Sequence, residues 1–427
     1  MSVNAALAAG LVGLFALSVP VAVSIALASI IAIHFFSNLP LLVVPQKMFT
    51  GLDSFPLMAV PFFILAGAIM TQGGISARLV DLVKSMVGSI QGGLASSCVL
   101  TCMLFAAISG SSVATTFAVG SILIPAMLRH GYPVGMAGAI QASSAELGVI
   151  IPPSVPLILY AVSTETSITR LFLAGMVPGL MIAAALVVMV QIWCRVKGHG
   201  KRDGEGRQAI LPAARRAFGA LMMPIIIVGG IYGGVFTPTE AAAVSVIYAL
   251  ILSIFVYREL SWSDLPGIFR AAAVSSGAVM LIISAAALFS FLISLSGLPG
   301  AVGTWAQENF GSALTFLLGV NLLLLVVGMF IETSAAILVL APILTPVAIS
   351  FGIDPVHFGI VIVVNLALGM ITPPLGVNLF AAAAVAKVPV QALFRSLVWP
   401  ILTVLVALAA ITYVPAISLG LGWWMMP

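Results

Sequence analysis

Two proline pairs, in corresponding places of two halves, constrain this chain most strongly. The heptapeptide LGVIIPP starts at Leu147 and LGMITPP starts at Leu368, an offset of 221 residues. The same offset aligns Pro125 with Pro346. Proline removes a backbone donor and interrupts a helix, and glycine adopts backbone angles that other residues avoid. The chain is therefore predicted to contain two related halves, each with a broken helix.

The composition places both halves in a membrane. Of the 427 residues, 62% are hydrophobic and 7% are charged, and the mean hydropathy is +1.26. A soluble domain carries about 25% charged residues, so a water-soluble enzyme is excluded. Disordered, collagen-like and disulfide-rich chains need polarity, a glycine period or many cysteines, respectively, so these classes are excluded as well. At roughly 20 residues per span, an all-α polytopic membrane protein with about ten to twelve spans is predicted.

The positions of Lys and Arg predict an orientation. One assignment of the apolar runs puts 14 of the 16 basic residues on a single side and leaves Lys47 and Arg170 on the other. Cytoplasmic loops are enriched in Lys and Arg, so that side is predicted to be cytoplasmic, with the N-terminus on it and the C-terminus opposite. The apolar stretch 5–33 lacks the basic segment of a signal peptide and is expected to span. The charged stretch 198–207 is interpreted as a cytoplasmic linker.

This orientation requires two segments that enter and leave the membrane on the same side. They are residues 91–127 and 312–349, with the small polar middles 108–112 (ISGSS) and 331–334 (IETS). Each is predicted to be a re-entrant hairpin with a polar tip, and the two hairpins open to opposite sides. Irregular backbone at this depth is tolerated where it is buried in protein or lines a cavity. The pattern predicts the inverted repeat of a secondary transporter.

The two breaks are predicted to bind cations. Unwound backbone at 148–153 and 369–374 frees carbonyl oxygens, which together with Ser and Thr hydroxyls suit a small alkali cation. Each break is expected to face one hairpin tip. Two ion sites follow from this arrangement.

Three acidic residues fall within apolar segments, where ionisable groups are usually functional. Glu332 lies at the second tip, where it either acts on the ion or caps a helix. Glu146 precedes the first break, where it either tunes the ion site or accepts hydrogen bonds from freed backbone donors. Glu240, in the sequence TPTE, is predicted to cap a helix.

An anionic substrate needs hydrogen-bond donors. No Lys or Arg falls within the central segments, so no basic residue is assigned to a substrate carboxylate. The N-termini of half-helices that follow each break have positive dipole ends that favour anions. The candidate substrate-binding side chains are Ser111, Ser112, Thr115, Thr333, Ser334 and Asn378.

These motifs resemble those of the large membrane subunit of TRAP transporters (tripartite ATP-independent periplasmic transporters, DctM-like), across essentially the whole chain. The resemblance implies a sodium-coupled importer of organic acids, such as C4-dicarboxylates, sialic acids or sugar acids, in a bacterial inner membrane. It implies an elevator mechanism and two partners, a small four-helix membrane subunit and a periplasmic substrate-binding protein. It rests on 109–115 (SGSSVAT), 146–154 (ELGVIIPPS), 236–241 (FTPTEA) and 370–374 (MITPP).

The same resemblance implies the ligands of two Na⁺ sites. The family commonly has a serine where this chain has Ala106, so one hydroxyl ligand of the first site is missing, and water or another backbone oxygen would replace it. The first site would consist of Ser109, Gly148, Ile151 and Pro153, and the second of Gly328, Gly369, Thr372 and Leu375.

The repeat and the resemblance together divide the chain into a transport domain and a scaffold. The scaffold is predicted to comprise residues 1–55, then 169–270 with the cytoplasmic loop 195–216 and an interfacial arm, while 397–427 form a C-terminal helix. The transport domain is predicted to comprise 56–168, with hairpin 91–127 and broken helix 134–164, and 271–396, with hairpin 312–349 and broken helix 356–386.

Other functions stay open beside sodium-coupled transport. A proton-coupled organic anion transporter fits the same architecture, and an ion channel could also use backbone carbonyls. An intramembrane hydrolase with Ser109 or Ser111 as nucleophile needs a partner base, and no His lies near these serines in the sequence. The chain lacks a phosphate-binding GxxxxGK[ST] motif and is predicted not to be an enzyme. The net charge of +4 gives no signal for nucleic acid, because the basic excess lies in loops.

Overall fold

A computed structural model describes residues 3–88, 90–201 and 209–425. Most of the predicted linker 198–207 lies outside the described residues. The described residues form helices and no strands. In the first half the helices are α1 (Val3–Ala16), α2 (Val21–Phe36), α3 (Val43–Thr50), α4 (Ala59–Gln72, after a short 3₁₀ turn), α5 (Ile75–Val87), α6 (Gly93–Ser109), α7 (Ser112–Arg129), α8 (Val134–Ala145), α9 (Leu147–Ile150), α10 (Val155–Thr164) and α11 (Ile168–Lys197).

The second half, after the residues outside the description, is also helical. Its helices are α12 (Ile210–Tyr232), α13 (Pro238–Ile251, extended by a π turn to Val256), α14 (Leu265–Leu295), α15 (Leu298–Asn309), α16 (Ala313–Phe330), α17 (Thr333–Ser350), α18 (Pro355–Met370), α19 (Val377–Ala386), α20 (Gln391–Tyr413) and α21 (Ala416–Met425).

The helices have the length and hydropathy of a polytopic membrane protein. Among the described residues, nine helices are long and apolar enough to cross a membrane. The pair Val134–Ile150 and Val155–Thr164, which bends by 41° at its break, raises this to ten if it counts as one span. The membrane class is confirmed. The number of spans is nine or ten, just below or at the lower end of the predicted ten to twelve, because several apolar helices are too short to cross alone.

The N-terminal apolar stretch does not form the single span expected from its hydropathy. It folds as two short helices, α1 and α2, which pack against each other. Ser18 between them has a positive φ of 59°, and Pro20 is the N-cap of α2. Proline lacks the backbone donor that would continue the helix. A hydropathy profile does not reveal this turn, because the flanking residues are apolar.

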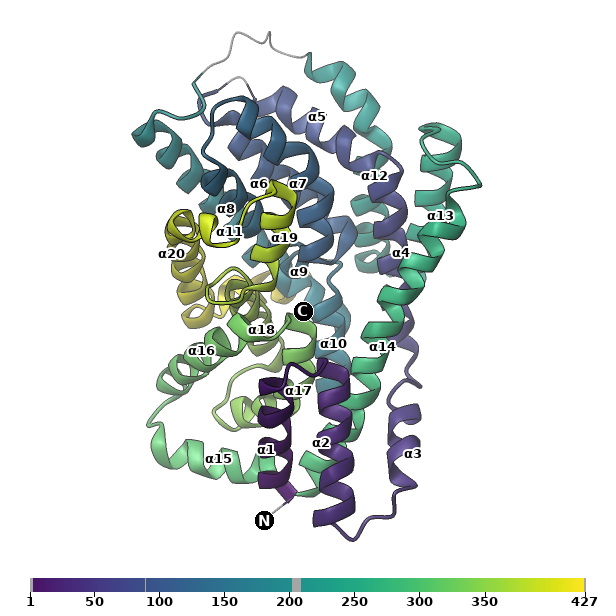
Figure 1. The fold of residues 1–427 in the computed structure, drawn as a ribbon, viewed down its shortest axis with the longest axis vertical. Helices are drawn as coiled ribbons and strands as arrows, with labels where there is room; N and C mark the ends of the chain where they lie inside the picture. Colours follow the sequence, from purple (N-terminus) through teal and green to yellow (C-terminus); the bar gives the residue numbers. More distant parts are fainter. Residues whose placement is uncertain (1–2, 89, 202–208, 426–427) are drawn as a thin grey trace.

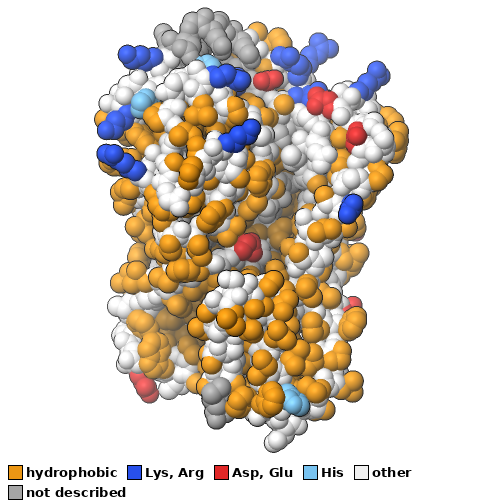
Figure 2. Space-filling view, in the orientation of Figure 1, with side chains coloured by type: hydrophobic (Ala, Val, Ile, Leu, Met, Phe, Trp, Pro, Cys, Tyr) orange, Lys and Arg blue, Asp and Glu red, His pale blue; other side chains and the backbone are white. Residues whose placement is uncertain are grey.

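The two ends of the molecule differ in their charged side chains. The N-terminus, α1, α2, α3 and α15 lie at one end of the long axis, and α5 lies at the other (Figure 1). Figure 2 shows Lys and Arg side chains gathered towards the end that contains α5, while hydrophobic side chains cover most of the face below them. Helix α1 therefore lies at the end opposite to the one where these Lys and Arg side chains gather.

Two helix pairs with short links recur at the 221-residue offset. α6 and α7 pack against each other and are linked by Gly110 and Ser111, and α16 and α17 are linked by Ile331 and Glu332. Shifted by 221, the bounds of α6 and α7 become 314–330 and 333–350, which match α16 and α17 to within one residue. The run α8–α10 likewise maps to 355–385, against 355–386 for α18 and α19.

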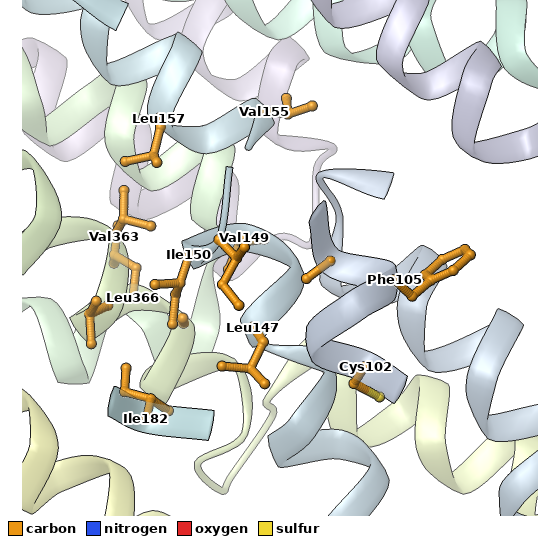
Figure 3. Packing of buried hydrophobic residues seen from close by; sticks show 14 of the residues in the cluster. Cys102, Phe105, Leu147, Val149, Ile150, Val155, Leu157, Ile182, Val363 and Leu366 are labelled. Carbon is orange, nitrogen blue, oxygen red and sulfur yellow. The ribbon is translucent and has the colours of Figure 1, made fainter. Parts of the chain in front are cut away.

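The first break is buried within the largest hydrophobic cluster. Figure 3 shows Leu147, Val149 and Ile150 of α9 between Phe105 of α6 and Val363 of α18. All of these residues are at most 3% exposed. The break is thus held by packing from both halves of the chain, so its irregular backbone is shielded from lipid.

Two groups of helices can be distinguished by their packing. α11 packs against α6, α9, α10, α18, α20 and α21. α4 packs mainly on α13 and α14, and α14 also packs on α2 and α3. A separate hydrophobic cluster joins α1, α2 and α14 through Leu7, Ile25 and Phe289. The long helix α11 therefore lies with the broken helices, whereas α4 and α14 lie with the N-terminal helices.

Candidate functional site

A cavity lies where the tips of the two helix pairs meet. Its volume is about 590 Å³, and both tips line it, together with parts of α4, α10 and α14. The start of α10 contributes Val155 and Pro156, which follow the first break. No Lys or Arg is among the described residues that line the cavity. The polar side chains at its wall are Thr71, Gln72, Ser109, Ser111, Ser112, Ser275, Glu332 and Ser334.

The first tip is a compact turn of hydroxyl and carbonyl oxygens. Ser109 Oγ lies 2.9 Å from Thr115 Oγ1, and the Thr115 hydroxyl donates to the Ser111 carbonyl at 2.7 Å. Ser111 is the N-cap of α7, and its side chain accepts a hydrogen bond from the Ala114 amide. Gly110 has a φ of +62°, a conformation that glycine adopts without strain, and this lets α6 end and α7 begin within two residues.

The first break packs directly on this tip. The Val155 amide donates to the Gly110 carbonyl at 3.3 Å, and a Cβ at Gly110 would lie 2.9 Å from the Pro153 carbonyl oxygen. A Cβ at Gly148 would lie 2.7 Å from the Ser111 carbonyl oxygen. The structure thus brings three of the four predicted ligands of the first site together, namely Ser109, Gly148 and Pro153.

The fourth predicted ligand of the first site, Ile151, is buried with its side chain turned towards another helix. A Cβ at Gly179 of α11 would collide with Cγ1 of Ile151. Ile151 and Pro152 also line an apolar cavity of about 410 Å³ between α6, α11 and α12. Only the backbone oxygen of Ile151 is chemically suited to an ion.

The second break shows a comparable close approach. A Cβ at Gly369 would lie 2.5 Å from Cα of Gly328, so α16 and the end of α18 are in backbone contact. The Gly376 amide donates to the Met329 carbonyl at 3.1 Å, which joins the residues after the break to α16. Thr372 donates its hydroxyl to the Leu368 carbonyl at 2.7 Å, which leaves the lone pairs of Oγ1 available. Leu375, the remaining predicted ligand, has an exposed side chain.

Glu332 caps the helix that follows the second tip. Its carboxylate accepts hydrogen bonds from the amides of Ser334 and Ala335 at 2.9 and 3.2 Å and from the Ser334 hydroxyl at 2.9 Å. A carboxylate at a helix N-terminus is stabilised by the free amides and the dipole. Glu332 also lines the cavity. The capping contact and the position beside the cavity are therefore both present.

Glu146 and Asn378 are partners inside the protein. Asn378 Nδ2 donates to Glu146 Oε1 at 2.8 Å, and Asn378 Oδ1 accepts a hydrogen bond from the Thr116 hydroxyl at 2.6 Å. Asn378 is fully buried and does not line the cavity. The structure thus places this predicted substrate-binding residue in a contact between the two halves.

The other predicted substrate-binding side chains divide into two layers. Ser111, Ser112 and Ser334 line the cavity. Thr115 and Thr333 are fully buried behind it, where Thr115 contacts Ser109 and the Thr333 hydroxyl lies 2.8 Å from the sulfur of Met370.

Sequence reasoning missed two polar clusters between helices, one partly buried and one buried. Asn365 Nδ2 donates to Asn321 Oδ1 at 2.7 Å, which joins α18 to α16. Gln141 of α8 contacts Cys98 of α6 and the Thr115 carbonyl of α7. A lone amide in a long apolar run is the signal that marks such residues, since an amide buried in a membrane needs a partner. The predicted cap at Glu240 is confirmed, because Glu240 and Thr237 form a reciprocal capping box.

Three comparisons relate the whole chain to known proteins. The family model described as "Tripartite ATP-independent periplasmic transporter, DctM component" matches residues 8–417. The chain is 45% identical to the C4-dicarboxylate TRAP transporter large permease protein DctM of Pseudomonas aeruginosa, over 89% of each chain. It is 36% identical to the sialic acid TRAP transporter large permease protein SiaM of Vibrio cholerae, over 96% of each chain.

A solved structure supports the fold. The YdaH transporter of Alcanivorax borkumensis is similar with a TM-score of 0.67 at 17% identity, over 92% of each chain. At that identity the likeness concerns the fold alone. The family match and the identity to full-length permeases decide the assignment: the chain belongs to the DctM family, the large membrane component of TRAP transporters.

Proposed function

We propose that this chain forms the transport pathway of a sodium-coupled importer of organic anions. The observation that carries the proposal is the meeting of two polar tips at one cavity, with a broken helix packed against each tip. Discontinuous helices near the membrane midplane are the common location of substrate and ion sites in secondary transporters.

Sodium coupling is supported by the chemistry of the two breaks. The oxygen atoms that could coordinate a cation at the first break are those of the Ser109 and Thr115 hydroxyls and of carbonyls such as that of Ser111. The second break offers Thr372 Oγ1 beside the contact of Gly328 with Gly369. Hard oxygen donors without a thiol or imidazole suit an alkali cation rather than a transition metal. In the first site the buried Ala106 contributes no hydroxyl, so Thr115 is a candidate replacement.

An organic anion is supported by three helix N-termini at the cavity. α7 and α10 begin at its wall with Ser112 and Val155, and α17 places its second residue, Ser334, there. The dipoles at helix N-termini attract anions, and Ser111 and Ser112 add hydroxyl groups, whereas the amide and hydroxyl of Ser334 donate to Glu332. Relatives named for C4-dicarboxylates and for sialic acid indicate a carboxylate substrate. The proposed substrate class is therefore a small carboxylate, either a C4-dicarboxylate or a sugar acid such as sialic acid.

We further propose an inverted repeat with two re-entrant hairpins and an elevator motion. The hairpins would be α6–α7 and α16–α17. Packing supports a division that differs from the one expected from the sequence. α11 would move with the hairpins and broken helices, whereas α4 and α14 would belong to the fixed scaffold with α1, α2, α12 and α13.

The distribution of charge supports a revised orientation in the bacterial inner membrane. If the end that carries most Lys and Arg faces the cytoplasm, the N-terminus lies on the periplasmic side (Figures 1 and 2). α20 starts shortly after Lys387 and would run away from that end, which keeps the C-terminal segment on the periplasmic side. The proposed partners are a small membrane subunit and a periplasmic binding protein. A relative named as a DctMQ permease, of which this chain matches 65%, is longer than this chain.

Uptake by the reconstituted complex tests the proposal. Proteoliposomes that contain this chain and the small subunit are given the binding protein loaded with a labelled C4-dicarboxylate or with sialic acid. An inward sodium gradient is expected to drive accumulation, whereas an equal potassium gradient is not. Accumulation driven by a proton gradient without sodium would overturn sodium coupling.

A further inference from the structure

A buried polar bridge joins the two halves of the chain beside the first break. Besides Glu146 and Thr116, Asn378 contacts the Ala142 carbonyl, to which Nδ2 donates at 3.0 Å. Thr116 belongs to α7, Ala142 to α8, Glu146 to the joint between α8 and α9, and Asn378 to α19. One amide side chain of the second half thus ties together the elements that form the first break and its tip.

The bridge is deeply buried and only partly satisfied. Asn378 and Thr116 are fully buried, and Glu146 is 3% exposed. The second carboxylate oxygen of Glu146, Oε2, has no hydrogen-bond partner among the described residues. Burying such groups at membrane depth costs free energy, so packing alone is a poor explanation for them.

The corresponding contact at the 221-residue offset shows that these helices can pack without polar side chains. At the 221-residue offset, the counterparts of Asn378, Thr116 and Glu146 are Leu157, Ile337 and Ala367. These three are buried and apolar, and their helices α10 and α17 pack against each other as α19 and α7 do. The polar bridge is therefore an addition to one of two otherwise similar contacts.

The bridge adjoins the first proposed cation site. Thr116 directly follows Thr115, whose hydroxyl lies 2.9 Å from Ser109 Oγ. Glu146 stands two residues before Gly148, which packs on the Ser111 carbonyl. A cation that orders the first tip against the first break would fix both residues that hold Asn378.

The bridge also adjoins the second break. Asn378 is the second residue of α19. Two residues earlier, the Gly376 amide donates to the Met329 carbonyl, next to Gly328. The position of Asn378 therefore sets where the chain leaves the second break, three residues from Leu375 and six from Thr372.

We propose that Glu146 and Asn378 are positioning residues that couple the two cation sites, so that a cation at one break favours binding at the other. The inference rests on the proposed sodium coupling. Cation binding at the first break orders Thr116 and Glu146, these orient Asn378, and Asn378 orders the second break. Such coupling is reciprocal, so weakening the bridge lowers the affinity of both sites.

The sodium dependence of thermal unfolding tests this coupling. The unfolding temperature of the purified protein is followed against NaCl, with choline chloride keeping the ionic strength constant. The wild type is expected to respond cooperatively, with a Hill coefficient towards about 2 for two sites, and Asn378→Leu to respond with a coefficient near 1. The half-saturating sodium concentration of Asn378→Leu is expected to rise at least about fivefold, as coupling energies of this kind predict.

Matched variants separate coupling from folding. Glu146→Gln keeps an acceptor for Asn378 and is expected to retain the steep response, whereas Glu146→Leu loses it. Asn321→Leu breaks the partly buried amide pair with Asn365 inside the second half and is expected to lower the unfolding temperature without changing the Hill coefficient. Thr116→Val removes the hydrogen bond to Asn378 together with the local contact to the Ser112 carbonyl and serves where Asn378→Leu fails to fold.

Two results would overturn the inference in different ways. If the sodium response of the wild type is cooperative and that of Asn378→Leu or Thr116→Val is equally cooperative, the coupling role of the bridge is overturned. The proposed function is then left intact. A wild type with no sodium-specific response overturns sodium coupling, and the bridge falls with it.

Discussion

Gly148 stands where the first break touches the first tip, and no side chain fits there. A Cβ would lie 2.7 Å from the Ser111 carbonyl oxygen and 2.8 Å from Thr115 Oγ1. Gly148→Val is expected to push the tip away from the break and to destabilise the protein by about 1–3 kcal/mol, as overpacked cores do. Sodium-driven uptake should be lost.

The control for this substitution is a glycine with open space around it. Gly277 of α14 is exposed, and a Cβ added there would meet no heavy atom within 4 Å. Gly277→Val should leave uptake close to that of the wild type. Equal losses in both variants would show that the close contact at Gly148 has no special role.

Thr372 is the one side-chain oxygen among the predicted ligands of the second site. Its hydroxyl hydrogen is engaged by the Leu368 carbonyl, so Oγ1 presents lone pairs to a cation. Thr372→Val has nearly the same shape and lacks this oxygen, so it is expected to raise the sodium concentration needed for half-maximal uptake. Thr372→Ser keeps the oxygen and should behave as the wild type. Unchanged sodium dependence in Thr372→Val would count against Thr372 as a ligand.

The sequence indicated which residues carry chemistry better than it indicated where they lie. The motif glycines and Ser109 lie at the tips and breaks as expected from the paired motifs, because the repeat itself marks them. Asn378 was expected at the substrate site and lies in a contact between the halves, since hydropathy gives no information on which face of α19 meets α7. The capping contacts of Glu332 depend on where α17 begins, which the sequence IETS left open.

At the level of elements, Arg78 of the short helix α5 contacts Tyr257 and Glu259, which follow α13 and its π turn. The Arg78 guanidinium lies 3.8 Å from the ring centre of Tyr257, forms an ion pair with Glu259 at 2.6 Å, and donates to the Gly74 carbonyl. In an elevator this contact would hold α5, which leads into the first hairpin. The position of α5 is therefore expected to depend on Arg78.

Substitution at this contact should separate its components. Arg78→Ala is expected to lower stability by about 1 kcal/mol, because both a cation–π contact and an ion pair are lost. Glu259→Gln should cost less, since the Glu259 side chain is 43% exposed and surface ion pairs contribute little. Thermal unfolding measures both changes. An effect of Glu259→Gln as large as that of Arg78→Ala would contradict the role given to Tyr257.

Some elements follow from the sequence and others do not. The helical membrane class follows from hydropathy, because runs of about 20 apolar residues have few alternatives. The turn between α1 and α2 does not, because it depends on the backbone of Ser18 and Pro20 inside an unbroken apolar stretch. Nor does the packing of α11 with the broken helices, which is decided by neighbours distant in the sequence.

At the scale of the whole molecule, an elevator requires the first tip to slide along the scaffold. Gly67 of α4 faces this tip, and a Cβ there would lie 3.5 Å from Cα of Ser109, which is an ordinary contact. Gly67→Ala should therefore keep uptake, whereas the longer side chain of Gly67→Leu should obstruct the tip and stop it. Sodium-dependent protection against unfolding should persist in both variants. Full uptake by Gly67→Leu would show that the tip does not pass this point.

Sodium is proposed to bind where the broken helices meet the tips. The most direct measurement is the thermal unfolding of the purified wild-type protein with its small subunit, against NaCl and against KCl or choline chloride of equal ionic strength. A ligand that binds only the folded state stabilises it by RT ln(1 + [L]/Kd). A saturable rise of the unfolding temperature is expected with sodium and none with potassium. Equal responses to all three salts would contradict it.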